Sequence, residues 1–554
     1  MADVDPDSRV RGLDDIFARF NRSDAPGLMV GIAHHGKLLY RRGFGLASME
    51  LAVANTPGTR MRIGSTSKHF ACLAALLLAE DGKLDVDASI RAYIPELPVL
   101  AGEPTLRQLM THTGGYRCYL DLSVLGNVGA MMEKGEAFRY QLLQQDVNFA
   151  PGERMAYCNG GYHLLSIAIA RASGMAFEAF LKRRIFEPLG MVDTDSVPSD
   201  LTVVPGRATP HVPQPDGSYR RGVLPLEDLL GEGAIVSTAA DMLIWLAHLR
   251  GTKRIGSEAS WAQMLSPARY SSGVVGTYCL GLERERYRGV EVIHHAGAVD
   301  GGASQMITVP EHELDIIVIT NGAPVSPTEL AWQVIDRLLG DDLLETVPPR
   351  VKTAGLERLI GRYWSQDTRT LVEILDDEGD LGFNLLNSIA LPVVADQNRY
   401  CVTFPGMGPL SFRHVCPVPA SLESDVPVMA LSNCGHVDRL VRLPDVAPPV
   451  TEFASGLTGE YVSNDLAARG TISFDGSMVT LAVRGTRSGW SSELKVISRD
   501  VAATSVKPGE LSVPSVLVVE RDDAGRLRGF RLSTTRSMNL HFVRIDDNAT
   551  QERE

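Results

Sequence analysis

A serine and a lysine stand three residues apart where an apolar segment begins, in "RIGSTSKHFACLAALLLAEDG" at 62–82. In a helix, positions i and i+3 lie on the same face, so the Ser65 hydroxyl and the Lys68 amine can approach to hydrogen-bonding distance. A neutral lysine amine can remove the hydroxyl proton, and a serine activated in this way can attack a carbonyl carbon. The pair therefore predicts acyl transfer through a covalent intermediate on Ser65.

The segment after Lys68 predicts that this lysine is buried. Residues 69–79, "HFACLAALLLA", are apolar almost all round, which is typical of a helix in the centre of a domain. Burial disfavours the ammonium form, and the positive end of the helix dipole adds to this effect, so we expect the pKa of Lys68 to fall from about 10.4. A fall of about 3 units, worth ~4 kcal/mol, would leave the amine neutral near pH 7.

This spacing is weak evidence by itself. A serine and a lysine three apart recur by chance in a chain of 554 residues, and Ser492 with Lys495 repeats the pattern. The alternative interpretation of Ser65 is an ordinary helix cap beside a surface lysine. Further groups that could complete a site are therefore needed.

Two other short motifs supply such groups. In "MAYCNGGYHLL", Tyr157 and Asn159 could point a phenol and an amide into one cavity, although an asparagine that starts a helix is the alternative. In "VIHHAGAVDGG", His295 ends a strand, and the small residues up to Gly297 would let a substrate lie along the strand edge. Structural histidines at a strand end are the alternative there.

The elements around these motifs predict an α/β layer. The first 45 residues indicate a helix with apolar Val10, Leu13, Ile16, Phe17 and Phe20, followed by the strands "LMVGIAH" and "KLLYRRGFG". A mostly helical stretch then precedes three strands, "GVEVIHH", "ASQMITV" and "LDIIVITN". A final helix, "SPTELAWQVIDRLLG", carries a capping box at Ser326 and Glu329 and ends at Gly340. Both ends of this unit are expected on the same face of one antiparallel sheet.

The C-terminal part predicts two β domains. "LETVPPRVKTAG" reads as a linker, and short alternating strands split by glycine, aspartate and proline follow it. "LIGRYWSQD" at 359–367 and "LTGEYVSND" at 457–465 share five residues in register, which indicates a duplicated unit. We therefore expect a catalytic domain at 1–345 and antiparallel β-barrel domains at 346–445 and 446–554.

Composition excludes several classes of function. A formal charge of −13 argues against a nucleic-acid partner. No secretory signal and no run of about 18 apolar residues is evident, so we expect a cytoplasmic protein without membrane contact. The seven scattered cysteines suggest neither a disulfide framework nor a zinc site, and no nucleotide or metalloprotease motif occurs. We expect no metal and no cofactor.

The three motifs together resemble a known family. The order Ser-x-x-Lys, Tyr-x-Asn, His-x-Gly is similar to that of the serine penicillin-recognising hydrolases, with His-Ala-Gly in place of Lys-Thr-Gly. Residues 1–345, including "LRQLMTHTGGY", resemble the class C β-lactamase and DD-peptidase family. The whole chain resembles the bacterial D-aminopeptidases of that family, in which two antiparallel β-barrels follow the catalytic domain.

This resemblance implies roles for the motif residues. Ser65 would be acylated, Lys68 would move protons, and Tyr157 would act as base or as acid to the leaving amine. Which of the two takes the first proton stays open, because strongly coupled groups titrate as a pair. Asn159, His295 and Gly297 would line the substrate pocket, with the oxyanion held by backbone N–H groups of Ser65 and of the strand after His295. The resemblance also implies a homodimer and inhibition by β-lactams.

In the D-aminopeptidases a loop of the last barrel reaches the active site, where its aspartate holds the substrate's α-ammonium. The matching segment here is "RGTRSGWSSEL" at 484–494, which contains no aspartate. Trp490 by cation–π contact, or Glu493 by its carboxylate, would take the ammonium instead. The leading hypothesis is a D-aminopeptidase acting on small peptides, amides or esters. A DD-carboxypeptidase or esterase of the same fold and a non-catalytic penicillin- or peptide-binding protein are the alternatives.

Overall fold

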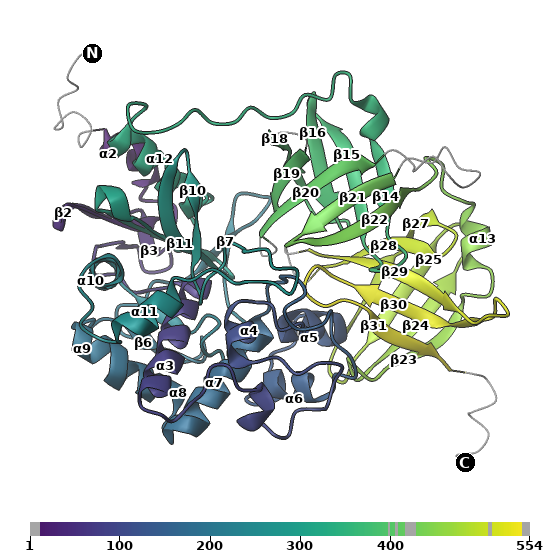
Figure 1. Cartoon of the computed structure of the whole chain (residues 1–554), viewed down its shortest axis with the longest axis horizontal. Coiled ribbons are helices and arrows are strands. Elements are labelled where there is room, and N and C mark those ends of the chain that lie inside the picture. Colours follow the sequence, from purple (N-terminus) through teal and green to yellow (C-terminus); the bar gives the residue numbers. More distant parts are fainter. Residues whose placement is uncertain (1–11, 397–398, 405–407, 416–427, 508–511, 546–554) are drawn as a thin grey trace.

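A computed structural model describes residues 12–396, 399–404, 408–415, 428–507 and 512–545. Val10 of the predicted first helix and Cys416 lie outside these ranges. Figure 1 shows an α/β unit built from the first part of the chain, beside two β units formed by the C-terminal part. This arrangement agrees with the fold class expected from the sequence.

The α/β unit is built on one six-stranded antiparallel sheet with the order β10-β11-β12-β13-β1-β2. Its strands are β1 (Leu28–His34), β2 (Lys37–Phe44), β10 (Glu283–Tyr287), β11 (Val290–Val299), β12 (Gly302–Val309) and β13 (Leu314–Thr320). The N-terminal hairpin pairs with β13, so strands almost 300 residues apart in the sequence become neighbours. The predicted strands are confirmed, and β11 brings the His295 motif to the middle of the unit.

One face of this sheet is covered by the two ends of the α/β unit. Helices α2 (Leu13–Phe17) and α12 (Pro327–Leu339) pack on it through a shared apolar cluster that contains Phe17 and Val334. The Ser326 hydroxyl caps α12 by accepting from the Glu329 N–H, and Gly340 ends it at a φ of 71°. The expected placement of both ends on one face is confirmed.

The other face carries the helical segment between β2 and β10. Its helices are α3 (Lys68–Glu80), α4 (Leu106–Met110), α5 (Tyr119–Asn127), α6 (Glu136–Leu142), α7 (Asn159–Ser173), α8 (Phe177–Leu181), α9 (Glu187–Leu189), α10 (Ala239–Arg250) and α11 (Glu258–Met264). The short strands β3 (Leu46–Ser48), β4 (Val53–Ala54), β5 (Met61–Arg62), β6 (Asp195–Ser196), β7 (His211–Pro213), β8 (Tyr219–Arg221) and β9 (Ile235–Ser237) connect them. Residues 68–78 of α3 are all buried, as its all-round apolar sequence predicts.

No single helix of the described chain is long and apolar enough to cross a membrane. One bent pair, Asn159–Ser173 with Phe177–Leu189, passes the same criterion by length and composition alone. Both members of that pair contribute side chains to the central apolar cluster of the α/β unit, among them Leu165 and Phe180. Their apolar character is therefore accounted for by packing within the domain.

Two nine-stranded antiparallel sheets follow the α/β unit. The first contains β14 (Gly361–Trp364), β15 (Leu371–Asp377), β16 (Asp380–Leu385), β17 (Ala390–Pro392), β18 (Val394–Asp396), β19 (Arg399–Phe404), β20 (Gly408–Val415), β21 (Val428–Asn433) and β22 (His436–Arg442). After α13 (Val450–Ala454), the second contains β23 (Gly459–Ser463), β24 (Ala468–Phe474), β25 (Val479–Arg484), β26 (Gly489–Glu493), β27 (Lys495–Ser498), β28 (Val501–Val506), β29 (Val513–Arg521), β30 (Leu527–Ser533) and β31 (Leu540–Arg544). Both curl into barrels that hydrogen bonds leave incompletely closed.

The two sheets are copies of one design. Their strand orders, β17-β16-β15-β14-β22-β21-β20-β19-β18 and β26-β25-β24-β23-β31-β30-β29-β28-β27, correspond strand for strand. The echo in the sequence marks their first strands. Tyr363 and Tyr461 are both fully buried, and their hydroxyls donate to the carbonyls of Leu359 and Leu457 respectively. The repeated tyrosine is therefore a structural device that ties each first strand to the chain preceding it.

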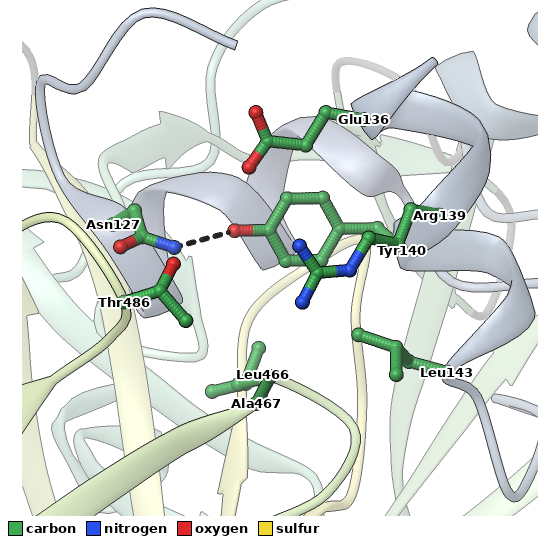
Figure 2. A pocket seen from close by; sticks show the side chains of 8 residues that line it. All are labelled: Asn127, Glu136, Arg139, Tyr140, Leu143, Leu466, Ala467 and Thr486. Carbon is green, nitrogen blue, oxygen red and sulfur yellow. Dashed lines mark hydrogen bonds between the residues drawn. The ribbon is translucent and has the colours of Figure 1, made fainter. Parts of the chain in front are cut away.

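The second sheet packs against helices α5 and α6. Figure 2 shows this contact as a small pocket lined by Asn127, Glu136, Arg139, Tyr140, Leu143, Leu466, Ala467 and Thr486. The Asn127 amide donates to the Tyr140 hydroxyl at 3.0 Å, which orders the helical side of the contact. These side chains hold the last barrel against the catalytic unit and do not include any of the predicted site residues.

Two glycines allow β11 to lie directly against the turn that carries Ser65. A Cβ on Gly297 would sit 1.9 Å from the Ile63 carbonyl oxygen, and a Cβ on Gly64 would sit 2.7 Å from the Ala298 nitrogen. Gly64 also has a φ of 52°, which favours glycine. No side chain fits at either position unless the backbone moves, so both glycines set the distance between the strand and the turn.

Gly297→Ala is expected to lower kcat/KM by about 100-fold, because an added methyl group pushes β11 away from Ser65 by an amount of the order of 1 Å. The measurement is steady-state hydrolysis by the folded variant, with circular dichroism to verify the fold.

Gly58→Ala provides the matched control, because the nearest atom to its added Cβ is 3.9 Å away, on Thr56. Wild-type rates from Gly297→Ala would contradict the role assigned to this close approach.

Candidate active site

Ser65 lies in a 3₁₀ turn, Gly64–Ser67, that runs directly into α3. The Lys68 Nζ is 3.0 Å from the Ser65 Oγ, and the lysine side chain is fully buried whereas Ser65 is partly exposed. The Thr66 hydroxyl is hydrogen-bonded to the His295 carbonyl and lies 2.9 Å from the Ser304 hydroxyl. The turn is thus held against both β11 and β12, with the serine open to the outside.

The surroundings of the Lys68 amine match a neutral base. Its Nζ is 2.8 Å from the Asn159 Oδ1 and 2.7 Å from the Glu232 carbonyl oxygen, and both of these atoms can only accept. A neutral amine has two N–H groups, which these acceptors use, and one lone pair, which is left for the Ser65 hydroxyl. Burial lowers the pKa of Lys68 to about 7, against an attraction from Glu232 that raises it.

The phenol of Tyr157 lies beside the same pair. The Lys68 Nζ is 4.7 Å from the centroid of the Tyr157 ring, and the phenol is close enough to Ser65 for the serine hydroxyl to influence its pKa. Burial raises the pKa of Tyr157 above its ordinary value, although the neighbouring Ser65 hydroxyl and the charge of Arg536 oppose that rise. A protonated phenol therefore faces the Ser65 oxygen and can supply a proton there.

A chain of neutral groups connects the Tyr157 segment to β11. The Cys158 N–H donates to the His112 Nδ1 at 3.0 Å, so His112 must carry its proton on Nε2 and donate it to Tyr278, whose oxygen is 3.2 Å away. Tyr278 can then donate to the His295 Nε2 at 2.9 Å, while the His295 Nδ1–H meets the Ala296 carbonyl. Burial lowers the pKa of both histidines, that of His295 to about 3. Both rings therefore stay uncharged.

Behind Lys68 lies a buried acid with its own partners. The Glu232 carboxylate accepts from the Tyr119 hydroxyl at 2.6 Å and is 3.2 Å from the His163 Nδ1. Burial acts to raise the pKa of Glu232, but His163 and Tyr119 outweigh it and the pKa is lowered. Burial likewise opposes protonation of His163, yet Glu232 raises its pKa. The result is a buried ion pair, and its negative charge acts to raise the pKa of Lys68.

The second barrel reaches the active site through the loop that joins β30 to β31, residues 534–539. The Asp121 carboxylate accepts from Thr534, Cys118 exchanges hydrogen bonds with the Ser537 hydroxyl, and Asn148 binds the backbone of Arg536 and Met538. In this firmly held loop, the Arg536 Cζ lies 5.3 Å from the centroid of the Tyr157 ring. A barrel side chain thus touches a predicted catalytic residue.

The equivalent turn of the first barrel, between β21 and β22, also meets the catalytic unit. Its Cys434 carbonyl accepts from the Ser272 hydroxyl at 2.9 Å, and Cys434 packs on the apolar cluster that contains Tyr278 and borders Tyr157. The His436 Nδ1 is 3.3 Å from the Glu153 carboxylate. Both barrels therefore contribute a hairpin to the surroundings of Tyr157.

The structure places Trp490 and Glu493 elsewhere. Residues 489–493 form strand β26 at the edge of the barrel, with Glu493 exposed and paired with Thr480. The Trp490 indole N–H donates to the Leu125 carbonyl at the end of α5. Within the described ranges, neither side chain forms a hydrogen bond, ion pair or ring contact with Ser65, Lys68 or Tyr157. The expected ammonium contact at 484–494 is therefore not seen, because this segment is used to dock the barrel.

The structure brings together Ser65, Lys68, Tyr157, Asn159, His295 and Gly297, as their motifs suggested. It adds Tyr278 and Arg536, which sequence reasoning missed. Tyr278 follows no recognisable spacing, and its role depends on two histidines 183 residues apart in the chain. Arg536 is one arginine in a Ser/Thr-rich turn, and only the docking of the barrel gives it significance.

Comparisons with known proteins show which proteins this chain resembles. Residues 13–339 match a family described as Beta-lactamase. A protein of Brucella canis named D-aminopeptidase is 25% identical over 545 residues, covering 94% of this chain and 96% of that protein. A protein of the same name from Brucella melitensis biotype 2 is 29% identical over the same lengths. The octameric penicillin-binding protein homologue from Pyrococcus abyssi shares the fold, with a TM-score of 0.54 at 21% identity over 79% of this chain and 100% of its own.

The pKa of Lys68 predicts how the reactivity of Ser65 depends on pH. We expect the second-order rate of modification by an uncharged sulfonyl fluoride to fall about tenfold per pH unit below about pH 7, because protonation removes the lone pair that activates the serine. An uncharged reagent is chosen so that its own ionisation does not enter the profile.

Glu232→Gln is the matched variant. The negative charge of Glu232 raises the pKa of Lys68, so its removal should move the midpoint to lower pH. A wild-type midpoint above pH 9, where an ordinary lysine titrates, would contradict a neutral Lys68.

Proposed function

Because the chain belongs to the β-lactamase family, we propose that it is a serine hydrolase that releases N-terminal D-residues from peptides, amides or esters through an acyl-enzyme on Ser65. The observation that carries this proposal is the fully buried Lys68 amine, 3.0 Å from the Ser65 hydroxyl and with both N–H groups engaged elsewhere. The specificity for D-residues is taken from relatives named D-aminopeptidase, which match 94% of this chain.

The first half-reaction begins with proton transfer to Lys68. As the Ser65 Oγ forms a bond to the substrate carbonyl carbon, its proton passes to the Lys68 lone pair, and the carbonyl π electrons move to the oxygen. The order of pKa values supports this assignment, because that of Lys68 is lowered to about 7 whereas that of Tyr157 is raised. Near neutral pH, Lys68 can therefore be present as the free base, whereas Tyr157 is protonated and is available as a proton donor.

Collapse of the tetrahedral intermediate requires a proton on the leaving amine. The carbonyl re-forms, the C–N bond breaks, and the Tyr157 phenol protonates the departing nitrogen. The new phenolate is stabilised by the Lys68 ammonium and Arg536 beside its ring, and it takes a proton from that ammonium, which restores both groups. The net transfer is one proton from Ser65 to the amine, which leaves the acyl ester on Ser65.

Water then releases the acid. A water molecule attacks the ester carbonyl and gives a proton to Lys68, and Ser65 leaves as the hydroxyl after it regains that proton. Two backbone N–H groups would hold the oxyanion in both half-reactions, a contribution commonly worth about 3 kcal/mol in rate. We assign them to Ser65 and Ala298, since the Ala298 nitrogen lies against Gly64 in the adjoining turn.

Ser65→Ala is expected to abolish turnover of D-alanine p-nitroanilide while the protein stays folded, because the nucleophile alone is removed from a partly exposed position. Mass spectrometry of wild-type enzyme after incubation with a D-alanyl ester should show an adduct on the peptide that contains Ser65. Ser67→Ala, one position before Lys68, tests the assignment, and an adduct lost from that variant alone would refute it.

Free-amine recognition is tested by comparing D-alanine p-nitroanilide with its N-acetyl form and with the L-isomer. An aminopeptidase that selects D-residues should cleave only the first. Equal cleavage of the acetylated compound would instead support the carboxypeptidase or esterase of the same fold. Binding of all three without turnover by the wild-type protein would support the non-catalytic alternative.

A further inference from the structure

We propose that Arg536, supplied by the second barrel, binds the free carboxylate of the residue that leaves, so that the preferred substrates are dipeptides with an unblocked C-terminus. This inference rests on the proposed function, because it assigns one side of the scissile bond to Arg536. It names a specificity-determining residue outside the catalytic domain.

Several hydrogen bonds from the catalytic domain hold the backbone around Arg536 in place. The Arg117 guanidinium, fully buried, donates to the carbonyls of Met538 and Asn539 at 2.9 and 3.2 Å. The Asn148 amide donates to the Arg536 carbonyl at 3.0 Å and its oxygen accepts from the Met538 N–H at 2.7 Å. The backbone at and after Arg536 is thus fixed to the catalytic domain. This restricts where the Arg536 side chain can lie and favours its position beside Tyr157.

The guanidinium itself has no anionic partner in the described parts of the chain, and it forms no hydrogen bond there either. Asp121 is the acid that most influences it, but the Asp121 carboxylate accepts from the Thr534 hydroxyl and makes no ion pair with Arg536. A partly buried arginine offers five N–H donors in a planar fork that matches a carboxylate. Leaving such a group partly buried and unpaired costs free energy that a bound anion would recover.

The place of Arg536 in the reaction follows from Tyr157. If Tyr157 protonates the leaving amine, groups that lie against its ring face the leaving side of the substrate. In an amino acid the carboxylate carbon is only two bonds from the amine nitrogen, and the Arg536 Cζ lies 5.3 Å from the centroid of the Tyr157 ring, beside the phenol that would protonate that amine. A carboxylate on the leaving residue can therefore meet the guanidinium while the amine meets the phenol.

The charges around Tyr157 also determine which end of the substrate, the ammonium or the carboxylate, can lie there. Arg536 and Lys68 both lie on the ring of Tyr157, and the charge of Arg536 lowers the pKa of Lys68. The surroundings of the Tyr157 ring near Arg536 therefore repel an ammonium and attract a carboxylate. The His-x-Gly strand adds no cation, because His295 is neutral at its lowered pKa of about 3. Arg536 stays a cation across the ordinary pH range, whereas Lys68 beside the same ring does not.

The experiment compares D-alanyl-glycine with D-alanyl-glycine amide, which differ only in the carboxylate. Wild-type enzyme should favour the free acid in kcat/KM. In Arg536→Gln the ratio of the two kcat/KM values should fall by about 10- to 100-fold, the range expected when a hydrogen bond to a charged group is lost. Arg536→Lys, which keeps the charge without the fork, should give an intermediate ratio.

Arg526→Gln is the matched control, because Arg526 is an exposed arginine of the same barrel, paired with Asp522 on the surface. Its ratio should equal that of the wild type. An equal loss for both substrates in Arg536→Gln, with a shifted pH profile for Ser65 modification, would overturn the proposal, because Arg536 would then act on Tyr157 and Lys68 alone. A wild-type ratio near one would overturn it as well.

Binding to the Ser65→Ala variant separates this proposal from the proposed function. Calorimetry should show that the free acid binds more tightly than the amide, and that the difference disappears in Ser65→Ala with Arg536→Gln. If the wild-type enzyme cleaves neither dipeptide while this binding difference persists, the hydrolase assignment fails and the carboxylate site stands. If Ser65→Ala binds D-alanyl-glycine and its amide equally well, the protein has no carboxylate site, whether or not the wild-type enzyme is active.

Discussion

The chemistry of this protein depends on one amine that water cannot reach. Lys68 is surrounded by acceptors that use its two N–H groups, so its lone pair has a single direction left, toward Ser65. A charged ammonium at the same place could also donate to the Ser65 oxygen, but it would bear the cost of burying an ion. Desolvation therefore favours the neutral amine, and the hydrogen bonds orient it.

Much of the α/β fold serves that arrangement. The apolar helix α3 takes Lys68 into the domain, the start of α7 presents Asn159, and the missing side chains of Gly64 and Gly297 let β11 approach the catalytic turn. The neutral chain from His112 through Tyr278 to His295 fixes the remaining wall without adding charge. Glu232 supplies the opposing influence, because its anion limits how far the pKa of Lys68 can fall.

Local patterns in the sequence were sufficient for part of this account. The Ser65 and Lys68 spacing, the apolar run after it and the strand that carries His295 are each short-range signals, and the repeated tyrosine motif revealed the paired barrels. Tyr278 and Arg536 could not be found in this way, because their roles exist only after distant segments meet. The expectation for Trp490 and Glu493 differed from the structure for the same reason, since which turn of a barrel faces the catalytic domain is decided by docking and not by local sequence.

The paired barrels differ at the equivalent hairpins that lie near Tyr157. Two residues, Cys434 and Gly435, join β21 to β22, whereas six, residues 534–539, join β30 to β31. If the two barrels arose by duplication, lengthening of the turn between β30 and β31 would have placed the Arg536 guanidinium beside the catalytic residue Tyr157. Substrate preference can thus change, in evolution or by design, through substitutions in the turn at 534–539 of the second barrel. Ser65 and Lys68 in the catalytic domain need not change.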